Sequence, residues 1–136
     1  MNTEQRAEPA LSPVSETSAR KLIDKLAGSG QLRASYLIRV LREGQMELFD
    51  HGFASLLQLD VEPMRKALYG ASPRAVALAC RAAGIDRSAF LTVFLLSRRH
   101  RQCGTALSDS DEREIQAVFS QVAKEDALQR LRATAA

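Results

Sequence analysis

Residues 72–86 read SPRAVALACRAAGID, and this stretch decides the fold class. The polar residues inside it, Arg74 and Arg81, lie seven positions apart and therefore share one narrow stripe of a helix. A serine and a proline open the stretch and a glycine closes it, which is the usual composition at the two ends of a helix. We therefore expect a helix over residues 73–84 that is covered on nearly every side and lies at the centre of the protein.

The segments on both sides of this stretch show the same helical pattern. Apolar residues recur every three or four positions, and Gly, Pro, Ser or Asp stands between the apolar runs, where helices end or begin. Strand-forming residues do not gather in alternating runs. We predict an all-α fold of about seven helices, over residues 15–28, 32–43, 45–58, 61–69, 73–84 and 87–101, with a long C-terminal helix that begins at 108.

The composition is that of an ordinary globular protein, with 46% hydrophobic and 26% charged residues. The polar segment 1–14 contains two prolines, and we expect it to be a disordered leader. Residues 15–136 are long enough for one helical domain with its own core.

An internal repeat organises the middle of the chain. An apolar residue followed by aspartate occurs at Leu59-Asp60 and again 26 residues later at Ile85-Asp86. Each aspartate is expected to cap the next helix, with its carboxylate accepting a backbone N–H. The alternative to a true repeat is chance similarity between short helices. We predict stacked antiparallel helix pairs, as in short HEAT-like repeats, over residues 15–43, 45–70 and 72–101.

Residues 54–68, ASLLQLDVEPMRKAL, have the spacing of buried residues found in a DNA-binding helix-turn-helix. However, Gln58 stands where that motif usually has glycine, and Glu62 would repel the phosphate backbone. The corner at Ile85 has the same spacing, but the apolar FLTVFLL that follows is unsuited to a DNA groove. We therefore interpret both corners as bends between packed helices.

Positive charge is concentrated in the middle third of the chain. Residues 64–107 hold eight Lys and Arg and one acid, whereas residues 1–63 and 108–136 each carry a net charge of −2. Two interpretations stay open: the acidic flanks neutralise the middle, or a basic face is free for nucleic acid or an acidic partner. For the arginines at 98–101, the alternative is a role at the helix end, with pairing to acids such as Asp109. The predicted partner-binding residues are Arg65, Lys66, Arg98, Arg99 and Arg101.

Residues that usually carry chemistry are sparse. His51 and His100 are isolated from any Cys, Asp or Glu at metal-ligand spacing, and there is no phosphate-binding loop or nucleophile elbow. We interpret His51 as structural, with phosphotransfer as the remote alternative. The sequence therefore predicts no catalytic residue, no cofactor and no metal. Cys80 lies in an apolar run, and we expect neither it nor Cys103 to form a disulfide in a cytoplasmic protein.

The longest apolar run, AFLTVFLL at residues 89–96, is too short to cross a bilayer. We therefore expect a soluble, cytoplasmic protein with no membrane partner. Covering such an apolar helix takes neighbours on nearly all sides. If the final helix does not provide this cover, we expect a homodimer through the sixth helix.

The sequence resembles a bacterial family known as the domain of unknown function number 2336, over about residues 19–97. The resemblance implies an all-helical, repeat-like fold and contributes no established activity. The final helix lies outside it. The matching residues are Gly30, Leu32, Leu37, Leu41, Glu43, Gly44, Phe49, Phe53, Leu59, Asp60, Val61, Leu68, Ala82, Ala83, Gly84, Ile85 and Phe90.

These observations favour a non-enzymatic helical module that acts as an adaptor or regulator by binding another protein. The alternative is a nucleic-acid-binding regulator that uses a basic surface in residues 64–107. The two hypotheses differ in how strongly binding should depend on salt.

Overall fold

The computed structural model describes residues 13–135, and this part of the chain is helical, without strands. Most of the leader predicted over residues 1–14 therefore lies outside the described residues. The all-α class and the approximate number of helices are confirmed. The eight helices of the described chain are α1 (Glu16–Gly28), α2 (Ala34–Arg42), α3 (Met46–Leu57), α4 (Val61–Tyr69), α5 (Pro73–Ala83), α6 (Arg87–His100), α7 (Asp109–Gln121) and α8 (Lys124–Ala135).

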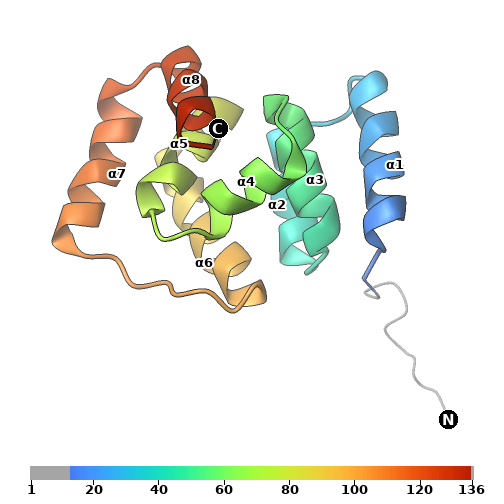
Figure 1. Ribbon diagram of the computed structural model, residues 1–136, viewed down its shortest axis with the longest axis horizontal. Helices are drawn as coiled ribbons and strands as arrows, with labels where there is room; N and C mark the ends of the chain where they lie inside the picture. Colours follow the sequence, from blue (N-terminus) through green and yellow to red (C-terminus); the bar gives the residue numbers. More distant parts are fainter. Residues whose placement is uncertain (1–12, 136) are drawn as a thin grey trace, which may run out of the picture.

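The helices form two groups that α4 joins (Figure 1). At one end, α1 and α2 pack on α3, and at the other, α7 and α8 pack on α5, while α4 contacts helices of both groups. The prediction that residues 73–84 form a central helix is confirmed, because eight of the eleven residues of α5 are buried. Small side chains dominate its surface, so neighbouring helices can approach it closely.

The first predicted helix pair does not pack mainly as a pair. Both α1 and α2 lie chiefly against α3 rather than against each other. The reason is Gly52 in α3, which leaves room for Ile23 of α1 and Leu37 of α2. A Cβ at residue 52 would come within 2.7 Å of Leu37 Cδ2 and 3.2 Å of Ile23 Cδ1. The absence of a side chain at residue 52 thus lets Ile23 of α1 and Leu37 of α2 pack closely against α3.

The two apolar-Asp corners have the same backbone geometry. Leu59 N–H donates to Ala54 O and Ile85 N–H donates to Cys80 O, both at 2.9 Å. In each corner the preceding residue is left-handed, with φ of 58° at Gln58 and 81° at Gly84. This is the Schellman arrangement that ends a helix. The same positive φ recurs at Gly30 and Gly44, so left-handed residues follow α1, α2 and α3 at intervals of 14 residues.

The helix starts mostly follow the predicted caps. The side chains of Ser72 and Asp86 accept backbone N–H groups of the next helix, and Ser108 forms a capping box with Asp111. Asp60 stands at the N-cap of α4, but its side chain makes no capping hydrogen bond. The predicted carboxylate cap at Asp60 is therefore wrong, although the helix begins where expected.

The predicted long C-terminal helix is wrong, because the chain breaks between α7 and α8. Val122 is extended, with φ −102° and ψ 124°, and its carbonyl accepts a 2.8 Å hydrogen bond from Arg81 Nε of α5. The break turns α8 back onto α5, where Ala127 and Leu131 are fully buried. The apolar spacing becomes less regular at the charged residues 124–126, which follow the break directly.

The apolar sixth helix is largely covered by its own chain. Phe90 and Phe94 of α6 are fully buried, and Phe119 of α7 contacts the Phe90 ring edge-on, with 5.6 Å between centroids. Leu91, with 43% of its surface exposed, is the large hydrophobic side chain of this helix that faces solvent. In the part of the chain that the structure describes, no helix combines the length and the apolar character needed to cross a membrane.

Replacing Gly52 by alanine tests the closure of α1 and α2 on α3. Alanine favours a helix by about 1 kcal/mol over glycine. We nevertheless expect Gly52→Ala to lower the free energy of unfolding by about 1–3 kcal/mol, because the new Cβ displaces packed core side chains. Gly28→Ala is the control, since a Cβ there meets nothing within 4 Å. Urea denaturation should show opposite signs for the two variants, and a stabilised Gly52→Ala would contradict the packing.

A second substitution pair tests the left-handed corners. A side chain costs roughly 1–2 kcal/mol in this conformation, part of which is offset by the greater flexibility of unfolded glycine. We expect Gln58→Gly to raise the free energy of unfolding by about 0.5–1 kcal/mol and Gly84→Ala to lower it by a similar amount. Thermal and urea denaturation would measure both. Equal signs for the two variants would show that the corners are not equivalent.

Candidate functional site

The five cations predicted to bind a partner divide into two groups. Lys66 and Arg99 are exposed. The other three are bonded to groups of the protein itself: Arg98 is 7% exposed, while Arg65 and Arg101 meet at one buried carboxylate. The structure therefore leaves two of the five predicted residues free to face a partner.

Arg98 ties the end of α4 to the loop that follows α6. Its Nη1 donates to Leu68 O and Gly70 O, both at 3.0 Å, and its Nε donates to Gly104 O. The guanidinium also lies over the Phe94 ring, 5.1 Å from the centroid. Because its donors satisfy backbone carbonyls, Arg98 supports the fold.

Asp50 of α3 is the centre of the internal charge cluster, and none of its surface is exposed. One carboxylate oxygen accepts a hydrogen bond from Tyr69 of α4. The other accepts hydrogen bonds from Arg65 Nε of α4, at 3.0 Å, and from Arg101 just after α6. A buried carboxylate is tolerated only when charges and donors compensate it, and here one side chain binds two other segments of the fold.

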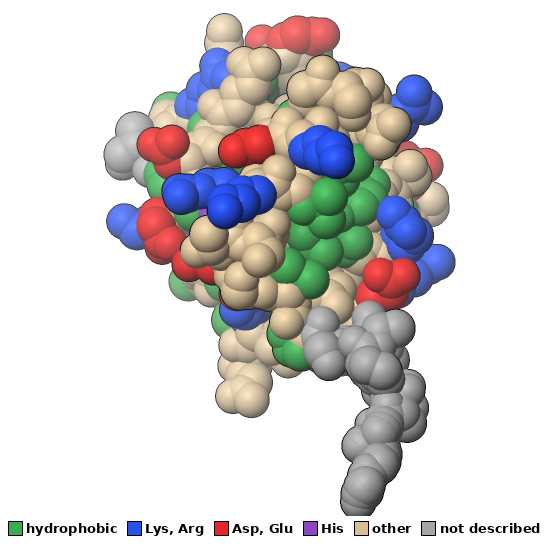
Figure 2. Space-filling model, turned by 90° about the vertical axis from the view of Figure 1, so that its right-hand side faces the viewer, with side chains coloured by type: hydrophobic (Ala, Val, Ile, Leu, Met, Phe, Trp, Pro, Cys, Tyr) green, Lys and Arg blue, Asp and Glu red, His purple; other side chains and the backbone are tan. Residues whose placement is uncertain are grey.

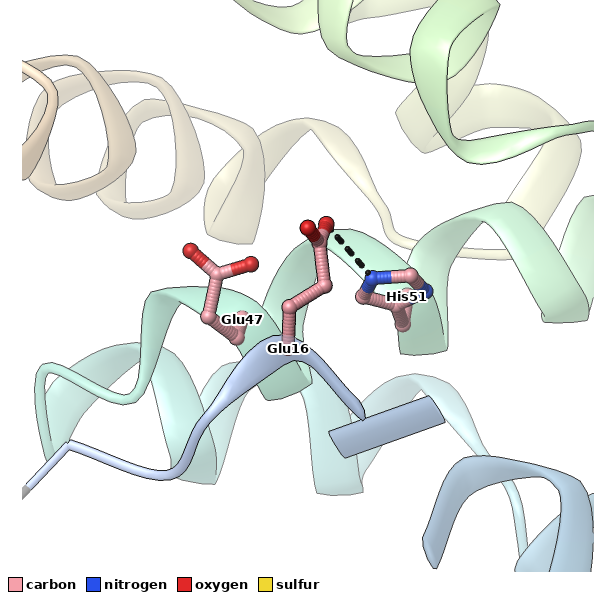
Figure 3. Close-up of side chains that lie close together, drawn as sticks. All are labelled: Glu16, Glu47 and His51. Atoms are coloured by element: carbon pink, nitrogen blue, oxygen red, sulfur yellow. Dashed lines mark hydrogen bonds and ion pairs between the residues drawn. The ribbon is translucent and has the colours of Figure 1, made fainter. Parts of the chain in front are cut away.

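Arg65 also forms ion pairs with the other three acids of this cluster. Its Nη2 lies 2.6 Å from Glu16 Oε1 and 2.7 Å from Glu47 Oε1, and its Nη1 lies 2.8 Å from Glu62 Oε2. Glu16 Oε1 also lies 3.0 Å from His51 Nε2 (Figure 3). The first turn of α1 is thereby held against α3 and α4 by charge, next to the apolar contact of Ile23.

These contacts change the proton affinities of the groups involved. Burial alone lowers the pKa of Arg65, but hydrogen bonds to Asp50, Glu16 and Glu62 outweigh it and raise the pKa above its ordinary value. Burial, followed by the negative charge of Asp50, raises the pKa of Tyr69. Hydrogen bonds from Arg65 and then His51 lower the pKa of Glu16. At neutral pH Tyr69 is therefore a neutral donor and Glu16 a carboxylate.

Glu16, Glu47 and His51 could in principle hold a metal ion, because one donor atom from each lies within 4.8 Å of the others. Figure 3 shows the three side chains side by side at the start of α1 and on α3. Arg65 already places a cationic nitrogen on both glutamates, at the distances given above. A metal ion would have to displace this guanidinium, so the geometry is that of an ion-pair network.

A surface pocket of about 450 Å³ lies next to the network. It is lined by Glu16, Glu47, Arg65, Tyr69, Arg101 and Cys103.

Two interpretations of the basic middle third were left open, and for Arg65 and Arg101 the one that holds is neutralisation by acids of a flanking segment. The acids that pair with them come from α1, α3 and the start of α4. On the C-terminal side, Arg87 lies 3.6 Å from Glu112 of α7. The exposed cations that form no ion pair with another described residue include a set on α1, α2 and the segment between them: Arg20, Lys21, Lys25, Arg33, Arg39 and Arg42.

A hydrophobic patch lies on the side of the molecule where α1 is outermost. Figure 2 shows it as one group of hydrophobic side chains, with Lys and Arg side chains above and to the right of it and an acidic side chain at its lower right. We define the α1–α2 face by Leu22 and Leu26 of α1 and Tyr36 of α2. Leu22 is 40% exposed, and Leu26 lies one turn further along the same side of α1. Leu26 and Tyr36 share a hollow of about 380 Å³.

The opposite side of α1 borders a different hollow. This second hollow measures about 570 Å³ and lies between α1 and the α3–α4 corner. Arg20, Asp24, Asp60 and Glu62 supply its charged groups, so acids outnumber bases there. Lys21 and Lys25 do not line this second hollow, and helix spacing places them next to Leu22, so the two sides of α1 differ in charge.

Sequence reasoning missed Asp50 and the α1–α2 face. Asp50 lies seven residues before the buried Leu57, so the two share one stripe of α3, and this spacing was the available signal for a buried acid. The exposure of Leu22 had no comparable signal, because Leu22, Ile23 and Leu26 together look like one core-facing stripe. Only the placement of α1 across α3 shows that Ile23 is buried and Leu22 is not.

The fold and these surfaces define an all-helical protein with an internal ion-pair network and an exposed apolar face. The chain matches, over residues 2–132, the family described as an uncharacterised protein conserved in bacteria, DUF2336, and it belongs to that family. The match includes α7 and most of α8, so the expectation that the final helix lies outside the resemblance is wrong. Comparison with curated proteins finds no match, and comparison with solved structures finds none.

Replacing Asp50 by asparagine tests the role of the buried carboxylate. The variant Asp50→Asn leaves two guanidinium groups without their shared counter-charge, and we expect it to lower the free energy of unfolding by about 3 kcal/mol. Asp60→Asn is the matched control, because Asp60 is exposed and makes no capping bond, and its effect should stay within about 0.5 kcal/mol. Urea denaturation at neutral pH measures both. Similar effects of the two substitutions would refute a central role for Asp50.

Proposed function

We propose that this protein is a non-enzymatic helical module that binds another protein through the α1–α2 face and acts as an adaptor or regulator in the cytoplasm. The observation that carries the proposal is the apolar patch on α1 and α2. Leu22 is 40% exposed there, and Leu26 and Tyr36 line an open hollow. Exposed apolar side chains grouped beside charged ones are typical of protein interfaces.

The way the charged groups are used supports a binding role over a catalytic one. Asp50 accepts hydrogen bonds from three donors, and Arg65 is bonded to four acids. Groups held in this way stabilise the arrangement of helices. A general acid or base needs an atom that can reach a substrate, and Asp50, none of whose surface is exposed, offers none.

Two alternatives rest on weaker observations. A nucleic-acid-binding regulator with the predicted basic surface would depend on Lys66 and Arg99, the two exposed members of the set. If they carry it, mobility-shift assays at low salt should show binding of duplex DNA or RNA that the double variant Lys66→Glu with Arg99→Glu abolishes. A homodimer through α6 would depend on Leu91, with the half-buried Leu95 and Leu96 beside it.

Site-specific photo-crosslinking tests the proposed function. A photoreactive phenylalanine analogue replaces Leu22 in one variant and Leu91 in another, and both are expressed in the source bacterium. The two leucines are matched in exposure, at 40% and 43%. We expect a covalent adduct with a different protein from position 22, absent at position 91.

Four results of this experiment decide between the hypotheses. An adduct with a different protein from position 22 alone supports the proposal. A nucleic-acid adduct, or no adduct at position 22, refutes it. An adduct between two copies through position 91 favours the homodimer.

A further inference from the structure

We infer that the α1–α2 face takes an amphipathic helix with acidic side chains beside its apolar stripe, an inference that rests on the function proposed above. The shape of the face is the first observation. Because α1 and α2 both pack on α3 and not mainly on each other, their outer sides border a hollow. Leu26, Tyr36 and Ser35 line it, and Leu22 stands one turn before Leu26. A row of apolar side chains on a partner would fit this hollow.

The charges around this hollow are the second observation. Arg39 of α2 lines the hollow, with its guanidinium 5.2 Å from the centre of the Tyr36 ring. Lys21 and Lys25 of α1 do not line it, but helix spacing places them beside Leu22. All three are exposed, and none forms an ion pair with another described residue. Glu43 lies in the next hollow along α2, but Arg39 and Arg42 line that hollow too, so its local charge stays positive. Acidic side chains on a partner would complement this face.

The backbone chemistry selects a helix as the form of the partner segment. A partner strand binds by hydrogen bonds to a free sheet edge, and the described chain contains no strand. A helix satisfies its own backbone and offers apolar side chains at every third or fourth position. Two such side chains, one turn apart, would contact Leu22 and Leu26, and acids on the flanking positions would then reach Lys25 and Arg39.

Other occupants fit these observations less well. A second copy bound through the same face would place two sets of Lys21, Lys25 and Arg39 in one interface, where like charges repel. An anionic bilayer would need several protruding apolar side chains, whereas Leu26 and Tyr36 are half-buried and Leu22 alone stands out. A nucleic acid would use the cations and leave the apolar hollow unfilled. Each of these occupants is an outcome of the test below.

Selection from a peptide library tests the inference on the whole protein. A displayed library of helical peptides, random at surface positions, is selected on the full chain and counter-selected on the Leu22→Asp variant. The enriched peptides should have apolar residues at three- and four-residue spacing with Asp or Glu beside them. A consensus peptide is then synthesised, and its affinity is measured by fluorescence anisotropy at low and high salt.

Two variants with reversed charges provide the decisive comparison. We expect the double variant Lys25→Glu with Arg39→Glu to weaken binding of the consensus peptide by about tenfold or more at low salt. Arg20→Glu is the control, because Arg20 lines the hollow on the other side of α1, and its effect should stay below about twofold. Circular dichroism shows whether the variants keep their helices, as expected for exposed cations without ion pairs.

The outcomes separate this inference from the proposed function. Enriched peptides without acidic bias, or peptides that bind the double variant equally well, overturn the inference, and the proposed function stands if position 22 still forms a protein adduct. No enrichment at all overturns the inference, and together with no adduct at position 22 it overturns both. Binding only to phosphatidylglycerol vesicles or to duplex DNA, or self-association by light scattering, would also overturn it in favour of that occupant.

Discussion

The hydrogen bonds that Asp50 accepts are the interaction on which the rest of the structure depends. An uncompensated carboxylate inside a helical core would cost several kcal/mol, roughly as much as half of a small domain's stability. Asp50 avoids this cost because Arg65, Tyr69 and Arg101 reach it from α4 and from the residue after α6. Arg65 also forms an ion pair with Glu16, so Asp50 of α3 is linked through Arg65 to the first turn of α1. The network also removes two arginines from the surface, whereas six exposed cations on α1, α2 and the segment between them form no ion pair with another described residue.

Local signals in the sequence were sufficient for the helices and most of their ends. Ser72, Pro73, Gly84 and Asp86 each act on the backbone within a few residues, and the structure has each of them at the expected helix end. The predicted centre of the fold follows from the same locality, since a helix made of Ala, Val and Leu has almost no side that tolerates water. Fold class and helix order were therefore predictable without knowledge of any tertiary contact.

The errors share a cause, which is contact between residues far apart in the chain. Arg81 donates a hydrogen bond to Val122 O at the break, 41 residues further along the chain, and no local signal in the sequence indicates this contact. Counting charges along the chain left open whether Arg65 and Arg101 are neutralised, because a count cannot show that Asp50 and Glu47 lie beside them. The apolar face on α1 was hidden for the same reason, since its exposure depends on how Gly52 positions α1 above α3.

The attachment of α1 has a consequence for how the family can diversify. Because α1 meets the rest of the described chain mainly through α3, with Ala19 and Ile23 fully or almost fully buried at the contact, its outer residues are released from core constraints. Substitutions at those positions can change the shape and charge of the exposed surface and leave the other helices undisturbed. The two sides of α1 can also change separately, because one side adjoins Tyr36 and the other adjoins the acidic corner before α4. A stable helical body thus carries one outer helix whose exposed surface can change in evolution at little cost to folding.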